Sequence, residues 1–101
     1  MSRFTVRDHK TGEVTHYEVG SLFDELKVEA TEQRLRIEAE ALKPRLILVA
    51  SWVGNFLEQF AKLFREVHIY MGDDFFLGEW WGLRIVACPS LDATGERVRV
   101  V

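Results

Sequence analysis

The segment that most constrains the fold is the apolar run from Leu46 to Ala50. It lies between Pro44-Arg45 and Ser51 and contains no charged or polar side chain. An unbroken apolar run of this length is typical of a central strand that is buried on both faces. We therefore expect a strand over 45–50. Pro44 ends the element before it, because the residue that precedes a proline disfavours the helical conformation.

The clearest helix follows directly, over residues 55–66. Asn55 and Glu58 have the spacing of a helix N-cap and its reciprocal partner. Apolar side chains recur here at intervals of three and four residues, which is the pattern of a helix with one buried face. These side chains are Phe56, Leu57, Phe60, Ala61 and Phe64. Residues 67–71 then form a further strand candidate.

Both ends of the chain also have strand character. Residues 3–19 are predicted to form a β-hairpin, in which Gly12 takes a positive φ in the loop. Towards the C-terminus, residues 83–87 are apolar except for Arg84 and indicate another strand. Residues 97–100 alternate between arginine and valine, which indicates a half-exposed strand.

Residues 27–43 allow two interpretations. As a helix, the segment carries an apolar residue at every seventh position, namely Val28, Leu35 and Leu42. As strands, apolar and charged residues alternate over 34–41, with a turn at Glu32-Gln33. We favour a helix over 31–43, because Thr31 is a good N-cap and the segment is rich in glutamate and alanine.

These elements together predict an α+β fold. A small mixed or antiparallel sheet, built from the N-terminal hairpin, the central strand 45–50 and the C-terminal strands, packs against the amphipathic helix 55–66 and the second helix 31–43. Ser21 is expected to cap a short helical turn that precedes the second helix. The chain has 101 residues, of which 48% are hydrophobic and 29% are charged. This composition predicts one modest core and a single domain over 1–101.

Charge and cysteine content narrow the classes of partner and compartment. The formal net charge is −3, whereas a protein that binds duplex nucleic acid presents a basic face, so we expect no nucleic-acid partner. Cys88 is the only cysteine, which excludes an intramolecular disulfide and fits a reducing compartment. No apolar run is long enough to span a bilayer, and the N-terminus has no apolar signal segment. We expect a cytoplasmic protein without membrane contact.

Side chains suited to chemistry are few and scattered. The Gly-Asp-Asp motif at 72–74 resembles the hairpin of RNA-dependent polymerases in which paired carboxylates hold Mg²⁺. A chain of 101 residues cannot wrap a template and a primer, so we interpret the motif as a turn. The three histidines, His9, His16 and His68, lack the spacing of a zinc site. Cys88 is interpreted as a buried structural thiol. We expect no catalytic residue, no bound metal and no cofactor.

The segment from Phe75 to Trp81 is the predicted working surface. It holds two adjacent aromatic pairs, Phe75-Phe76 and Trp80-Trp81, with Gly78 as the expected turn between them. Neighbours on a strand point to opposite faces, so each pair is expected to place one ring on each side of the sheet. Exposed aromatic side chains mark interaction sites, which predicts a protein partner or self-association into a homo-oligomer. The predicted partner-binding residues are Phe75, Phe76, Trp80, Trp81 and Arg84.

Residues Gly82 to Leu91 resemble a segment of small accessory and structural proteins of tailed bacteriophages. In that segment a glycine precedes a short β-run, which ends in a proline and a second apolar residue. The resemblance covers ten residues and includes no catalytic residue. It implies a phage gene whose product acts in virion assembly or binds a host factor.

The sequence therefore predicts a non-enzymatic protein-interaction or assembly module. The alternative is a small-ligand-binding protein or a minor enzyme with a site at Ser51–Asn55, near Asp73 and Asp74. Ligands often bind at the carboxyl ends of strands in α/β sheets, which is where this alternative site would lie.

Overall fold

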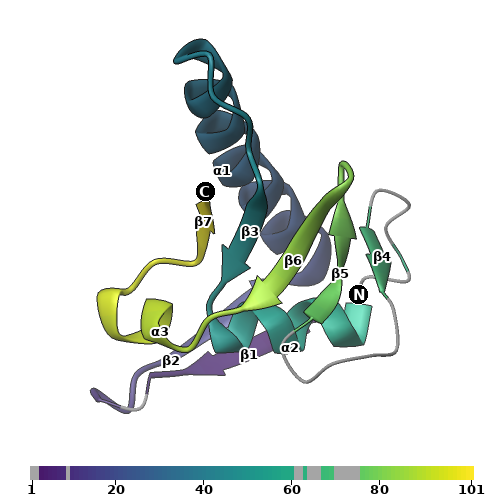
Figure 1. The fold of residues 1–101 in the computed structure, drawn as a ribbon. Helices are drawn as coiled ribbons and strands as arrows, with labels where there is room; N and C mark the ends of the chain where they lie inside the picture. Colours follow the sequence, from purple (N-terminus) through teal and green to yellow (C-terminus); the bar gives the residue numbers. More distant parts are fainter. Residues whose placement is uncertain (1–2, 9, 61–62, 64–66, 70–75) are drawn as a thin grey trace.

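The computed structural model describes residues 3–8, 10–60, 63, 67–69 and 76–101, with the backbone alone for 67–69 and 76. The chain has the predicted α+β fold (Figure 1). The elements are β1 (Arg3–Arg7), β2 (Val14–Glu18), α1 (Val19–Ala39), β3 (Leu46–Val49), α2 (Ser51–Phe60), β4 (Val67–Ile69), β5 (Phe76–Trp80), β6 (Leu83–Ala87), α3 (Ser90–Thr94) and β7 (Val98–Val100).

Among the described residues, the larger of two sheets is mixed and has five strands in the order β4-β5-β6-β3-β7. Strand β3 runs parallel to β6 and antiparallel to β7, while β5 pairs antiparallel with both β4 and β6. Strands β1 and β2 form the predicted hairpin, but they make a two-stranded sheet of their own instead of joining the larger one. The hairpin packs on α2 through Phe4, whose ring contacts Phe56 and Phe60 with centroids 5.3 and 6.1 Å apart.

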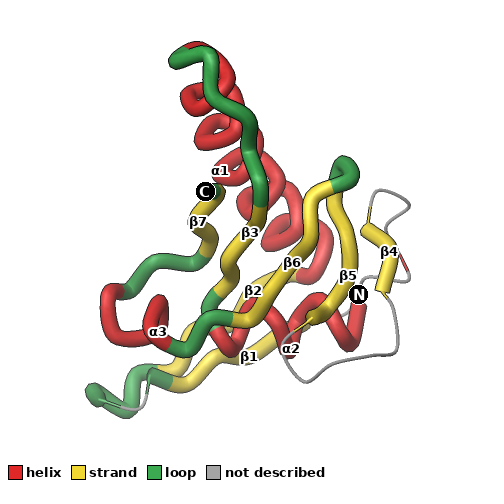
Figure 2. Tube along the Cα trace, viewed as in Figure 1, coloured by secondary structure: helices red, strands yellow, loops and turns green. Residues whose placement is uncertain are grey.

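The two longer helices lie on the same face of the five-stranded sheet. Figure 2 shows α1 and α2 behind the sheet in this view, with α1 continuing beyond it. On this inner face Ile47 has an exposed fraction of 0% and Val49 of 1%. Helix α2 approaches the sheet closely at Gly54, where a Cβ atom would lie 2.9 Å from Cδ1 of Leu77. The core is therefore a layer between the helices and one side of the sheet.

Helix α1 is a single helix of 21 residues, whereas the sequence predicted a short turn followed by a separate helix over 31–43. Its buried face runs without a break through Val19, Leu22, Phe23, Leu26 and Ala30. A continuous apolar face holds one helix against one core, so no new start at Thr31 is needed. The helical interpretation of 27–43 is confirmed as far as Ala39 and is wrong beyond it.

The C-terminus of α1 is a Schellman motif. The N–H of Leu42 donates to the carbonyl of Ile37 at 3.2 Å, and the N–H of Ala41 donates to that of Glu38 at 3.0 Å. Ala41 has a φ of 60°, in the left-handed region that glycine usually occupies at this position. The helix ends here because the chain reverses through this left-handed residue, which costs about 1 kcal/mol for a side chain with a Cβ atom.

Helix α2 begins four residues before the predicted helix 55–66. The backbone N–H of Ser51 donates to Oδ1 of Asp92, in α3, at 3.0 Å. This carboxylate satisfies an N–H at the helix start that has no partner inside the helix. Asn55 lies within α2 and accepts a hydrogen bond from a residue of the same helix, so its predicted role as N-cap is wrong. Most of the predicted helix after Phe60 lies outside the described residues.

The turn predicted at Gly78 lies further along the chain. Gly78 belongs to β5, beside an irregularity in its pairing with β6. The chain reverses instead at Trp81 and Gly82, whose φ angles are 55° and 78°, between the paired residues Trp80 and Leu83. Two positive φ angles between paired strand ends form a type I′ turn, which matches the twist of a two-residue hairpin.

Replacing Ala41 by glycine is expected to raise the free energy of unfolding by about 1 kcal/mol, because glycine adopts the left-handed conformation without a steric cost. Ala39→Gly, in the last helical turn, is the matched control and is expected to lower it by roughly 0.5–1 kcal/mol. Urea denaturation followed by circular dichroism measures both variants. An Ala41→Gly protein no more stable than the parent would contradict the strain assigned to this position.

Candidate functional site

The outer face of the five-stranded sheet, opposite α1 and α2, is the candidate site. Strand register determines which side chains share it. Leu46 lies opposite Arg84, and Leu48 lies between Val86 and Arg99. Directly paired residues point to the same side of a sheet. Leu46, Leu48 and Val86 therefore form a contiguous apolar strip on this face, which we call the outer strip.

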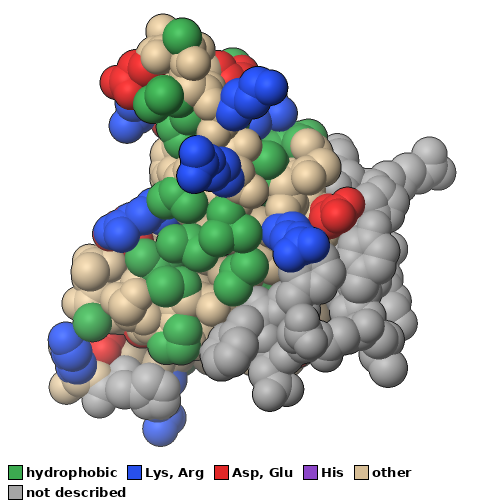
Figure 3. All heavy atoms as spheres, viewed as in Figure 1, with side chains coloured by type: hydrophobic (Ala, Val, Ile, Leu, Met, Phe, Trp, Pro, Cys, Tyr) green, Lys and Arg blue, Asp and Glu red, His purple; other side chains and the backbone are tan. Residues whose placement is uncertain are grey.

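The outer strip is not covered by the described helices. Its three residues are half-buried, whereas Ile47 and Val49, which alternate with them along β3, are fully buried. Figure 3 looks onto this face and shows an apolar patch across its middle, with lysine and arginine side chains on either side. The prediction that the central strand is buried on both faces is confirmed for the inner face. It is wrong for the outer face, because α1 and α2 pack on the same side.

Two arginines border the outer strip. Arg84 on β6 faces Glu79 of β5, and Nε of Arg99 on β7 donates to Oε2 of Glu96 at 2.9 Å. The hydrogen bond from Arg99 holds the pKa of Glu96 below its ordinary value, and the same bond raises the pKa of Arg99. Glu79 lies one strand beyond Arg84, and Glu96 precedes β7. In each of these pairs, the arginine is the member that lies beside the outer strip.

The structure distributes the predicted partner-binding residues over several environments. Arg84 is exposed on the outer face. Trp80 has an exposed fraction of 1%, so the expectation that it lies at the surface is wrong and it belongs to the core. Trp81 is half-buried at the β5–β6 turn. Phe75 lies outside the described residues, and for Phe76 only the backbone is described, at the start of β5.

Trp80 and Trp81 stack on each other, although strand alternation predicts that they point to opposite faces. Their ring centroids are 4.6 Å apart with 24° between the planes. The prediction fails because Trp81 is in the turn, where its left-handed backbone directs the ring back to Trp80. The stack continues to Phe23, 5.3 Å from Trp80, and to the guanidinium of Arg34, 4.3 Å from Trp81. These contacts pack the tip of the β5–β6 hairpin against α1.

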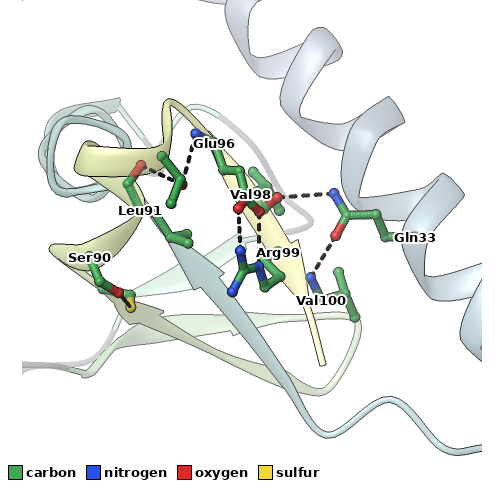
Figure 4. Close-up of polar contacts among 9 residues, drawn as sticks. Gln33, Ser90, Leu91, Glu96, Val98, Arg99 and Val100 are labelled. Carbon is green, nitrogen blue, oxygen red and sulfur yellow. Dashed lines mark hydrogen bonds and ion pairs between the residues drawn. The ribbon is translucent and has the colours of Figure 1, made fainter.

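The free edge of β7 is closed by one side chain of α1. Gln33 donates from Nε2 to the carbonyl of Val98 at 3.0 Å and accepts from the N–H of Val100 at 2.8 Å (Figure 4). A further strand would use these same two backbone groups. Nearby, Nε of Arg97 donates to Glu29 at 3.1 Å. Burial acts to lower the pKa of Arg97, but the hydrogen bond and charge of Glu29 outweigh it and raise that pKa.

Sequence reasoning did not single out the outer strip. The signal for it is the run Leu46–Ala50, because a strand that is apolar on both sides needs a covering layer on each. Within the residues described, only α1 and α2 are helices of ten residues or more. When both lie on one side, the other side of the strand is left open.

The alternative site at Ser51–Asn55 borders a groove of about 770 Å³ between the hairpin and α3. The rings of Tyr17 and Trp52 stack in its wall with centroids 5.7 Å apart. The N-terminus of α2 already has the carboxylate of Asp92 as its partner. The predicted neighbours Asp73 and Asp74 lie outside the described residues, so the ligand-binding alternative stays a prediction.

Among the residues that the structure describes, the other chemistry-bearing side chains do not converge on one site. Cys88 is half-buried, not buried as predicted, and its Sγ lies 3.0 Å from Oγ of Ser90. His16 is exposed, with Nδ1 3.0 Å from Oγ1 of Thr5. In the described part of the chain, no three histidine, cysteine, aspartate or glutamate side chains are placed to hold a metal ion. None of the described helices is long and apolar enough to cross a membrane.

Comparison of the chain with protein-family models, curated proteins and solved structures finds no match. The resemblance of Gly82–Leu91 to tailed-bacteriophage proteins therefore stays a prediction. The assignment of the outer strip rests on register, burial and charge alone.

Trp81→Ala is expected to lower the free energy of unfolding by about 2 kcal/mol, because it removes the stack on Trp80 and the contact with Arg34. Trp81→Asn loses the same contacts, but asparagine tolerates positive φ, so we expect it to be more stable than the alanine variant. Urea denaturation of both variants separates the loss of the ring contacts from the backbone strain at position 81. An asparagine variant less stable than the alanine variant would show that backbone strain at position 81 is negligible.

Proposed function

We propose that the chain is a non-enzymatic protein-interaction module that binds its partner through the outer face of the five-stranded sheet. One observation carries the proposal. Strand β3 is apolar on both sides, but only its inner side, at Ile47 and Val49, is fully buried. An apolar sheet face normally packs against a second layer, and contiguous apolar surface marks interaction sites. A bound partner would supply that missing layer over the outer strip.

The border of the outer strip indicates the chemistry of the partner. Arg84 and Arg99 are the exposed residues directly paired with Leu46 and Leu48. A matching surface has an apolar centre with carboxylates on its flanks. Burial of apolar area supplies affinity, at about 25 cal/mol per Å² before the costs of association. The charged border favours the correct orientation and a fast encounter.

A phage gene and a cytoplasmic location belong to the same proposal. The segment Gly82–Leu91 supports the first, and the single cysteine, Cys88, supports the second. A protein that binds a host factor or an assembling virion needs a binding surface but no catalytic group. The outer strip meets that requirement.

Leu48→Glu tests the proposal at the centre of the outer strip. The new carboxylate is expected to repel an acidic partner, while the neighbouring Arg99 accommodates its charge and the fold is kept. Val14→Glu is the matched control, because Val14 has an exposed fraction of 40% and lies on β2, outside the strip. The parent and both variants are used as bait in a host lysate, and the captured proteins are quantified by mass spectrometry.

The parent and Val14→Glu are expected to capture the same proteins. The captured amount of each is expected to be lower by roughly tenfold or more with Leu48→Glu, as for a residue central to an interface. Circular dichroism of each bait establishes that it is folded. A folded Leu48→Glu protein that still captures the same proteins at the same level would show that the outer strip is not the binding surface.

A further inference from the structure

Helix α1 carries a second uncovered apolar surface. Val28 and Leu35 have exposed fractions of 55% and 53%. Seven residues make about two turns of helix, so Val28 and Leu35 lie one above the other. They point away from the buried face that contains Leu26 and Ala30. We call Val28 and Leu35 the helix stripe.

The border of the helix stripe is acidic. Residues three or four positions apart are neighbours on a helix surface. Every charged residue at these distances from Val28 or Leu35 is an exposed carboxylate, namely Asp24, Glu25, Glu32 and Glu38. The helix stripe therefore has the chemistry that the outer strip requires, with an apolar centre and negative flanks.

We infer that the partner of the outer strip is a second copy of this chain, which docks its helix stripe onto the strip. This inference rests on the proposed function of the outer face. Charge selects the pairing. Two helix stripes packed together would place carboxylates such as Glu32 and Glu38 against carboxylates, and two outer strips would place Arg84 and Arg99 against arginines. Only the pairing of stripe with strip brings opposite charges together around a shared apolar centre.

The positions of the two surfaces determine the kind of assembly. Figure 1 shows α1 behind the five-stranded sheet. The helix stripe lies opposite the buried face of α1, and the outer strip lies on the face of the sheet opposite Ile47 and Val49. A two-fold dimer of two copies therefore cannot bury the helix stripe and the outer strip of both copies at once. Contacts between unlike surfaces continue from copy to copy, as a ring or an open series. A single helix of 21 residues, about 30 Å long, gives a small interface, so the association depends on concentration.

Two variants and their mixture test this arrangement by sedimentation velocity over a range of concentrations. Leu35→Arg places a cation on the helix stripe, where it opposes Arg84 and Arg99 of the next copy. Leu48→Glu places a carboxylate on the outer strip, where it opposes the acidic border of the stripe. Val14→Glu is again the control. The parent and the control are expected to associate with rising concentration, whereas each variant alone remains monomeric or needs a roughly tenfold higher concentration.

The mixture of Leu35→Arg and Leu48→Glu is expected to associate, because one variant supplies an intact strip and the other an intact stripe. If the parent stays monomeric, if either variant alone associates like the parent, or if the mixture does not associate, the inference is overturned. The proposed function is unaffected by these results if Leu48→Glu abolishes the capture of other proteins. If Leu48→Glu still self-associates and still captures the same proteins as the parent, both the inference and the proposed function are wrong.

Discussion

Burial of one side of β3 against α1 and α2 is the contact on which the rest of the structure depends. Ile47 and Val49 are fully buried there, and β6 and β7 pair with β3 on either side. Because side chains alternate along a strand, burying these two residues sends Leu46 and Leu48 to the opposite face. The core and the candidate site are thus two consequences of one register.

Elements whose pattern is local were predictable from the sequence. The hairpin has β-prone stretches on either side of a turn, β3 is an unbroken apolar run, and α2 has the period of a helix, so their existence could be inferred without a structure. Helix α1 was harder, because the seven-residue spacing of Val28 and Leu35 marks its exposed side. The buried side at Leu22 and Leu26 establishes where the helix begins. The exposure of the outer strip depends on which face of the sheet α1 and α2 pack against, and no local sequence pattern determines that face.

Other features depend on partners that are distant in the sequence. Asp92 determines where α2 begins from 41 residues away, and Gln33 contacts β7 across 65 residues. Trp81 occupies a left-handed turn position that its residue type disfavours, and its stack with Trp80 compensates for the strain. Such a position is unpredictable from propensity, because the compensating contacts exist only in the folded state.

The closure of β7 by Gln33 limits the ways in which copies of this chain can join. The backbone groups of Val98 and Val100 that face away from β3 are already satisfied, so this edge offers no template for a cross-β ladder. At this edge, association between copies would have to use side-chain surfaces instead. Contacts of that kind dissociate on dilution and weaken with ionic strength, whereas a shared backbone ladder does neither readily. At this edge, the hydrogen bonds of Gln33 block the addition of a further strand, which is the first step towards a fibril.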